Sequence, residues 1–389
     1  MLLKSETGNQ DSVILSTTPI SVGIVSLGAC ALAEPGSGFP AGGAEVQLYI
    51  IARMLAAEED FRVTLHVADI GQPERVENGL RIKPLVRLKP GLQISASAAP
   101  AIIGRLARER HRVYVTRSAS SINGLTQIAA QLCGGRHMHM CAHDNECAGL
   151  ADATLSKPAK WFQNMGLRRA DMVTCQTIRQ IELLRSTFGI QGFLAPNISP
   201  DLFAVPANEP REGVLWVGRD VDWKGPELFV ELARRLPDHP FTMICQPQPG
   251  RDFQRLTAAA PKNVRLVPGL PIQEAAPLFA RHRVFALTSL SEGFPNVLLQ
   301  SARSGTPVVS LCVDPENILS SNKAGFACQG SFDEVVRRTA ELLKDPLLWE
   351  ECHEGALRLT QETEGSGERI VGLIRTLAVQ DVAARTSKG

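Results

Sequence analysis

The stretch "VLWVGRDVDWKGPELFVELARRLP", residues 214–237, contains a complete strand–loop–helix unit. It begins with four apolar residues, which is typical of a strand buried on both faces of a parallel sheet. After Pro226 the apolar residues recur at helical spacing, and the segment ends at Pro237. A buried strand followed directly by an amphipathic helix is the repeating unit of α/β proteins. The stretch therefore predicts a parallel sheet covered by helices.

The same alternation runs through most of the chain, apart from a linker-like stretch rich in proline and charge at 197–213. Two Rossmann-like parallel-sheet domains in series, facing each other across a cleft, would account for this pattern. Ligands of such sheets lie beyond the carboxyl ends of the strands. We predict a loose tail at 1–20, a first domain at 21–205, a second domain at 206–365, and a helical tail at 366–389, for which we consider packing on the first domain.

Length and composition agree with two ordinary globular domains. The chain has 389 residues, of which 44% are apolar and 21% charged, and its net charge of +1 gives no sign of a nucleic-acid partner. Its nine cysteines are scattered through apolar runs, which favours reduced thiols over a disulfide framework. The first residues lack the apolar core of a signal peptide. We therefore expect a cytoplasmic protein.

The stretch "HMHMCAHDNEC", residues 137–147, gathers side chains that bind metals elsewhere. If residues 137–144 form a strand, His137, His139, Cys141 and His143 share one face. Neighbours on that face are about 6.6 Å apart, whereas zinc holds its ligands at about 2.0–2.3 Å. We therefore predict no metal site here and buried packing for the first three side chains. His143 is the candidate functional residue, because it lies at the carboxyl end of the strand, which opens onto the cleft.

Two loops of the second half carry the more specific signal. Arg219 and Lys224 lie five residues apart between a strand and a helix, where they can converge on one diphosphate together with the amides of the helix start. Two solvated loop cations would be the alternative for this pair alone. In 287–309, "LTSLSEGFPNVLLQSARSGTPVV", Glu292 can accept hydrogen bonds from sugar hydroxyls, and a helix opens near Asn296.

Taken in order, these segments resemble glycosyltransferase family 4, a retaining group that uses nucleotide sugars and has the GT-B fold. The resemblance covers about residues 21–375, and it implies an acceptor-side domain at 21–205 and a nucleotide-sugar-binding domain at 206–365. It rests on "GGAEVQLYIIARMLA" (42–56), "VGRDVDWKG" (217–225), "SEGFPNVLLQSARSGTPVV" (291–309) and "AGFACQGSFDEVVRRTAELLKDP" (324–346).

The resemblance implies a role for each candidate catalytic residue. Arg219 and Lys224 should hold the donor diphosphate and offset charge on the departing nucleotide. Glu292 should contact the donor sugar, and His143 matches a histidine of the family that helps to orient the sugar near the reacting centre.

Further residues are expected to bind the donor. Gly42 and Gly43 should let the first domain approach the phosphate and the acceptor closely. Gln300 stands where the family has a second glutamate, so its contact with the ribose should be weaker. The backbone of four residues should line the sugar and phosphate pocket: Gly293, Phe294, Pro295 and Asn296.

The implied reaction is transfer of a hexose, with retention, from a UDP- or GDP-sugar to a hydroxyl of a glycan or lipid-linked acceptor, in surface or exopolysaccharide assembly. No cofactor and no metal are expected. The alternatives are a non-catalytic GT-B scaffold, which only Gln300 favours, or another GT-B activity such as an epimerase. The segment 157–169 mixes basic and apolar residues, so peripheral membrane contact is a further hypothesis. A packed surface helix is the favoured interpretation of that segment.

Overall fold

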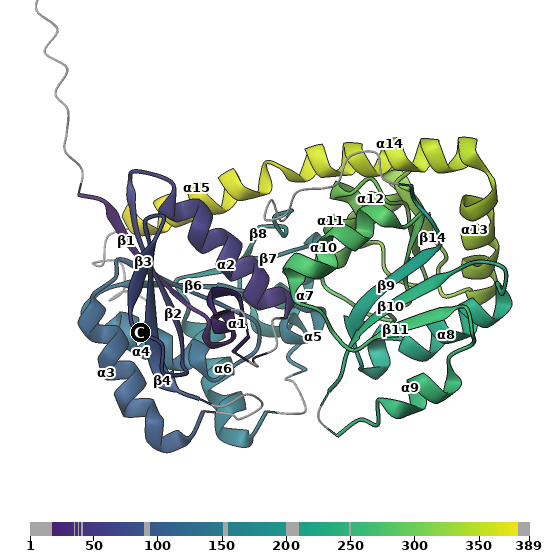
Figure 1. Ribbon diagram of the computed structural model, residues 1–389. Helices are drawn as coiled ribbons and strands as arrows, with labels where there is room; N and C mark the ends of the chain where they lie inside the picture. The colour runs from purple at the N-terminus through teal and green to yellow at the C-terminus, as the bar shows by residue number, and fades with distance from the viewer. Residues whose placement is uncertain are drawn as a thin grey trace, which may run out of the picture.

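The computed structural model describes residues 18–34, 36–37, 39, 42–88, 94–150, 155–199, 210–248 and 250–379. They form two α/β domains, each built around a mainly parallel sheet (Figure 1). The predicted fold class, a GT-B arrangement of two Rossmann-like domains, is confirmed. The predicted boundary between 205 and 206, residues 1–17 of the predicted N-terminal tail and residues 380–389 of the predicted C-terminal tail lie outside the described residues.

The N-terminal sheet has eight strands in the order β3-β4-β2-β1-β5-β6-β7-β8, and only the β3–β4 pair is antiparallel. The strands are β1 (Ile20–Val25), β2 (Phe61–Asp69), β3 (Arg75–Glu77), β4 (Leu80–Arg87), β5 (Val113–Arg117), β6 (Arg136–Met140), β7 (Met172–Cys175) and β8 (Gly192–Leu194).

Helices cover both faces of this sheet. The helices are η1 (Leu27–Ala29), α1 (Cys30–Ala33), α2 (Gly43–Ala56), η2 (Ala96–Ala98), α3 (Ala99–Glu109), α4 (Ile122–Cys133), α5 (Asp144–Cys147), α6 (Lys157–Arg169) and α7 (Ile178–Phe188). Side chains of α2 join the core with Val22 and Ile24 of β1, whereas α3 and α4 pack with Tyr114 of β5 in a second cluster.

The C-terminal sheet is wholly parallel, in the order β11-β10-β9-β12-β13-β14. Its strands are β9 (Val214–Arg219), β10 (Phe241–Gln246), β11 (Val264–Val267), β12 (Val284–Leu287), β13 (Val308–Ser310) and β14 (Gly325–Ala327). Val214 and Trp216 of β9 enter one hydrophobic cluster and Leu215 the other, which explains why the strand is apolar at consecutive positions. The chain reverses its direction of strand addition between β9 and β12, where such sheets bind ligands.

The helices of this domain pack on both faces of its sheet. They are η3 (Asp222–Lys224), α8 (Pro226–Arg235), α9 (Gln254–Ala259), α10 (Ile272–Arg281), α11 (Asn296–Arg303), η4 (Pro315–Asn317), α12 (Ile318–Asn322), α13 (Phe332–Lys344) and α14 (Pro346–Thr363). The start of α11 at Asn296 confirms the predicted helix opening.

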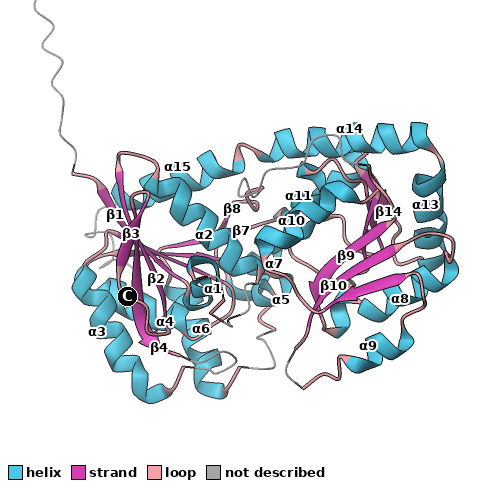
Figure 2. Cartoon of the chain, in the orientation of Figure 1, coloured by secondary structure: helices cyan, strands magenta, loops and turns pink. Residues whose placement is uncertain are grey.

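The last helix returns to the first domain. Helix α14 packs on the C-terminal domain through Ala356 and Leu359. Helix α15 (Ser366–Val379) then buries Ile370 and Ile374 in the N-terminal core. The two helices run along one side of the molecule and span both domains (Figures 1 and 2).

One sequence prediction is wrong in its extent. The strand expected at 137–144 ends at Met140, so His143 does not share a strand face with His137 and His139. His143 instead precedes α5 as its N-cap, with an extended backbone. The one-face argument therefore applies only to His137 and His139.

We expect Ile374→Ala to destabilise the N-terminal domain by about 2–5 kcal/mol, because it leaves a cavity in a core that the chain closes only with its last helix. Leu347→Ala, at an 83% exposed position in α14, is the matched control and should change the free energy of unfolding by less than about 0.5 kcal/mol. Urea unfolding measures both effects. Equal effects would mean that α15 does not close this core.

Candidate active site

The candidate residues gather where the carboxyl ends of the two sheets approach each other. Arg219 ends β9, and Glu292 follows β12, so both lie at the point where strand order reverses. In the N-terminal domain, β5 ends at Arg117 and occupies the corresponding position beside β1. Hydrogen bonds between the domains, described below, connect these two regions.

A threonine that follows β12, Thr288, holds the loop after β9 in place. Thr288 Oγ1 accepts from Trp216 Nε1 (2.9 Å) and lies 2.8 Å from the carbonyl oxygens of Lys224 and Gly225, which share its one proton. Gly225 has φ +61°, and a Cβ there would meet the carbonyl oxygen of Thr288 at 2.7 Å. Glycine is therefore required for the turn that places Lys224 at the start of α8.

Two of the residues predicted to bind the nucleotide sugar are in direct contact. Lys224 Nζ forms an ion pair with Glu292 Oε1, and the two side chains are only 15% and 11% exposed. Arg219 is more exposed, and its guanidinium lies over the ring of Trp223 at 5.9 Å from the centroid. The structure thus brings Lys224 and Glu292 together, with Arg219 on the same loop.

The segment 293–296 fits tightly against the N-terminal domain. A Cβ on Gly293 would meet both the carbonyl oxygen of Ala142 and Nε2 of Gln180 at 2.7 Å. Glycine is therefore needed at 293 because another domain approaches it, and Phe294 beside it is only 6% exposed. Pro295 is buried at the N-cap of α11.

Asn197 links this segment to the N-terminal sheet. Its Nδ2 donates to the carbonyl oxygen of Phe294 (2.7 Å) and to Oδ1 of Asn296 (2.8 Å). Its Oδ1 accepts from Nη2 of Arg117 (2.5 Å) and Nε2 of Gln176 (2.9 Å). The oxygen of this amide therefore bonds to the N-terminal domain and its nitrogen to the C-terminal domain.

A second amide reinforces this contact. Gln47 of α2 exchanges two hydrogen bonds with the backbone of Ile198, at 2.8 and 2.9 Å, and donates to Oδ1 of Asn296 at 3.2 Å. Asn296 Nδ2 in turn donates to the carbonyl oxygen of Gly43 (2.8 Å). We call Gln47, Gln176, Asn197 and Asn296 the interdomain amide network.

The glycines at the start of α2 have different neighbours. A Cβ on Gly43 would come within 2.8 Å of Asn296 Nδ2. The group that approaches Gly43 closely in this structure is therefore a side chain of the C-terminal domain. A Cβ on Gly42 would meet a carboxylate oxygen of Glu45 at 2.6 Å. The predicted contacts of both glycines with phosphate and acceptor stay predictions.

Arg117 is a charged residue of the site that the sequence analysis did not identify. It is 6% exposed, and burial lowers the pKa of its guanidinium to about 10, so it remains charged at neutral pH. Its sequence signal was a cation that ends the apolar strand "VYVTR". The network amides were missed as well, because no local pattern identifies an amide that hydrogen-bonds across domains.

His143 has a defined tautomer. Its Nδ1 accepts from the backbone N–H of Asn145 (3.1 Å), so the neutral ring carries its proton on Nε2. The side chain is half-buried. Gln300, one turn after Asn296 on α11, is also half-buried.

The predicted packing of His137, His139 and Cys141 is confirmed, since all three are at most 1% exposed. Thr116 Oγ1 lies 2.8 Å from His137 Nε2 and 3.1 Å from His139 Nδ1. Nε2 of His139 is 2.7 Å from Oε1 of Glu146. Burial alone would raise the pKa of Glu146, but His139, the Ala142 N–H and Gln163 together lower it.

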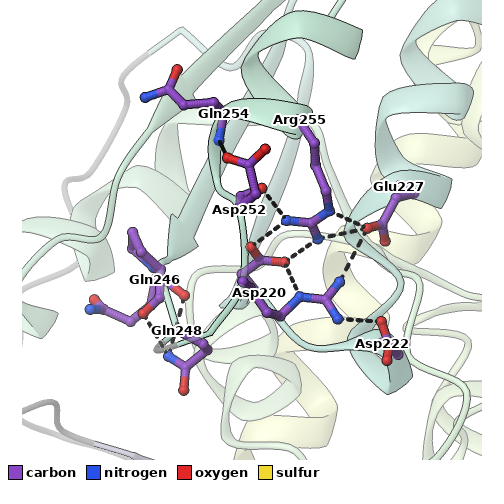
Figure 3. Close-up of polar contacts among 10 residues, drawn as sticks. Asp220, Asp222, Glu227, Gln246, Gln248, Asp252, Gln254 and Arg255 are labelled. Atoms are coloured by element: carbon purple, nitrogen blue, oxygen red, sulfur yellow. Dashed lines mark hydrogen bonds and ion pairs between the residues drawn. The ribbon is translucent and has the colours of Figure 1, made fainter.

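An ion-pair cluster lies next to Arg219, around Asp220 (Figure 3). Asp220, next to Arg219, is fully buried and accepts from Arg255 (2.7 and 2.5 Å) and from Arg251 (3.1 Å). These hydrogen bonds, led by that of Arg255, lower the pKa of Asp220. Glu227 of α8 forms ion pairs with both arginines, so Arg251 and Arg255 are held to the segment that follows Arg219.

Comparison with known proteins agrees with this geometry. Residues 211–345 match the family model described as glycosyl transferases group 1. No curated protein sequence matches the chain significantly.

Three solved structures illustrate the similarity in fold. Sucrose-phosphate synthase from Thermosynechococcus elongatus has a TM-score of 0.72 and 17% identity, over 92% of this chain and 99% of that one. The HepE protein of Anabaena, in complex with UDP and glucose, has a TM-score of 0.70 and 12% identity, over 92% and 100%. WaaG, a glycosyltransferase involved in lipopolysaccharide biosynthesis, has a TM-score of 0.68 and 16% identity, over 91% and 99%. These structures share the GT-B fold with almost the whole of this chain. The match of residues 211–345 supports a nucleotide-sugar-dependent transferase.

We expect Asn197→Ala to loosen the contact between the domains, because it leaves the buried Arg117 and the Phe294 carbonyl without their shared partner. The cost should be about 1–3 kcal/mol for each unsatisfied group. Asn263→Ala is the matched control, since Asn263 Nδ2 donates to three carbonyl oxygens within the C-terminal domain. Small-angle scattering should detect an expanded molecule for Asn197→Ala only; an unchanged radius of gyration would contradict the predicted role.

Proposed function

We propose that the chain transfers a hexose from a nucleoside diphosphate sugar to an acceptor hydroxyl with retention at the anomeric carbon. The observation that carries this proposal is the Lys224–Glu292 ion pair at the strand-order reversal of a group 1 glycosyltransferase domain. A cation suited to phosphate and a carboxylate suited to sugar hydroxyls are held in contact there.

Donor binding would exchange this ion pair for two new contacts. The diphosphate replaces Glu292 as the partner of Lys224, and Arg219 supplies a second, planar set of donors from the same loop. The released carboxylate of Glu292 then accepts hydrogen bonds from the hexose. UDP is the first nucleotide to test as part of the donor, because the HepE structure of similar fold holds UDP and glucose.

The rest of the donor would lie along α11 and the segment before it. The backbone of Gly293, Phe294, Pro295 and Asn296 would border the sugar and phosphate, and the N-terminus of α11 favours an anion. Gln300 would accept a hydrogen bond from the ribose, without the charge of a glutamate. Gly42 and Gly43 would border the phosphate and the acceptor from the other domain.

The chemistry would depend on stabilising the leaving nucleotide. Arg219 and Lys224 offset the charge that develops on the diphosphate, and removal of such a donor typically costs about 10²–10³ in rate. In a front-face route the departing phosphate accepts the proton of the acceptor hydroxyl, so no second catalytic carboxylate is required. His143, which presents Nε2–H, would orient the sugar. The proposal requires no metal ion and no cofactor for the transfer.

The acceptor would be a glycan or a lipid-linked sugar, as in surface polysaccharide assembly. Helix α6 packs on α4 through Gly166 and Gln163 and leaves Trp161 61% exposed beside basic residues, which suits peripheral contact with an anionic membrane. Among the described residues, no helix is long and apolar enough to cross a membrane.

Calorimetric titration with UDP- and GDP-sugars in the presence of a chelator tests donor binding. We expect one donor to bind saturably, and Lys224→Ala to weaken it by roughly 10–100-fold, because a charged hydrogen bond is lost. Lys323→Ala is the matched control: it also breaks a lysine–glutamate pair of the same domain, with Glu351, but on an exposed surface. If none of the UDP- and GDP-sugars binds, the result would favour the non-catalytic scaffold.

The stereochemistry of turnover tests the reaction class. With the donor so identified, NMR should show a product with the anomeric configuration of the donor, and Arg219→Ala should lower kcat by about 10²–10³. An inverted product would contradict retention. A donor sugar that is isomerised but not transferred would instead establish an epimerase.

A further inference from the structure

Three cysteines lie together beneath the site. Cys141 follows β6, Cys147 ends α5 and Cys175 ends β7, and their Sγ atoms all lie within 4.8 Å of one another. Each residue is at most 1% exposed. We call these residues the thiol trio; no other three cysteines among the described residues meet in this way.

The backbone holds the trio in place. Cys141 N donates to the carbonyl oxygen of Thr174 (2.8 Å), the residue before Cys175, which joins the ends of β6 and β7. Cys147 lies one turn into the helix that His143 caps. The three sulfurs are therefore gathered by secondary structure that would be present with or without a ligand, so binding would need only side-chain rotation.

The spacing suits one ion. Zinc holds thiolate sulfur at about 2.3 Å, so three sulfurs around one ion are separated by roughly 3.8–4.0 Å. This separation lies within the 4.8 Å limit of the trio. Sulfur ligands alone select soft, thiophilic cations such as Zn²⁺ and its heavier homologue Cd²⁺.

A second group of potential ligands, His139 and Glu146 with Cys141, is less suited. Both nitrogens of the His139 ring are already within hydrogen-bond distance of partners, Thr116 and Glu146. The carboxylate of Glu146 also accepts from Gln163 (2.8 Å) and from the Ala142 N–H (3.1 Å). A metal ion would have to displace these contacts, whereas the trio offers three sulfurs.

A buried cation lies near the trio. Three thiolates and one divalent cation carry a net charge of −1. The negative charges of Glu146 and Cys141 both raise the pKa of Arg117, which is only 6% exposed. Arg117 therefore offsets part of the negative charge that a loaded trio would bring into the core.

We propose that Cys141, Cys147 and Cys175 bind one thiophilic divalent cation as three thiolates. Loading replaces three S–H protons, which pass to solvent, by one ion. The site is separate from the sugar-transfer chemistry. It departs from the prediction of no metal site in 137–147, which applied to ligands along a single strand, because Cys147 lies on α5 and Cys175 on β7. The ion would brace the segment that carries His143 and Gln176.

The test uses the reduced, chelator-treated full chain with CdCl₂ as the probe. Native mass spectrometry should show one bound Cd²⁺, ultraviolet absorbance should show thiolate–cadmium charge transfer that saturates at one equivalent, and the Tm should rise. These readouts need no variant. A wild-type chain without a one-to-one complex would overturn the proposal.

Variants locate the ion. Cys147→Ser should weaken Cd²⁺ binding by at least the roughly 10–100-fold that loss of an outer-shell partner costs. Cys352→Ser, at a buried thiol of the other domain, should bind as the wild type does. If Cys147→Ser does not fold, Cys175→Ser takes its place. Equal affinity in the trio variant and the control would assign the ion to other thiols and overturn the proposal.

Discussion

The side-chain amide of Asn197 is the contact on which the arrangement of the site depends. Its oxygen accepts from Arg117 and Gln176 of the N-terminal domain, and its nitrogen donates to Phe294 and Asn296 of the C-terminal domain. An amide is suited to this position because it presents an acceptor to one side and donors to the other. A carboxylate could satisfy only Arg117 and Gln176, so the neutral side chain is dictated by what it must join.

The charged groups of the site are arranged so that a ligand can exchange partners with them. Lys224 and Glu292 neutralise each other while partly buried, which avoids the cost of an isolated charge. A diphosphate sugar offers an anion for the lysine and hydroxyls for the glutamate, so both remain satisfied after exchange. The cluster around Asp220 is different: two arginines already surround a fully buried carboxylate, which suits it to hold a loop in place.

How much the sequence could predict follows from the range of each interaction. The alternation of strand and helix, and the start of α11 at Asn296, are local patterns, and they agree with the structure. Gln47 and Asn296 are 249 residues apart, and no periodicity relates two amides over that separation. The end of β6 at Met140 was also missed, because His143 continues the alternation of His137 and His139 in sequence although it caps α5 in the structure.

The position of the thiol trio follows from the same alternation that builds the site. Neighbouring residues at a strand end point to opposite sides. At the end of β7, Cys175 packs in a small cluster with Val173 and Leu184, whereas Gln176 reaches Asn197. Sulfur is apolar enough to fill such a cluster and still able to bind a cation when three thiols meet. The buried layer below the amide network therefore stabilises the fold as it stands and becomes more rigid once an ion is bound.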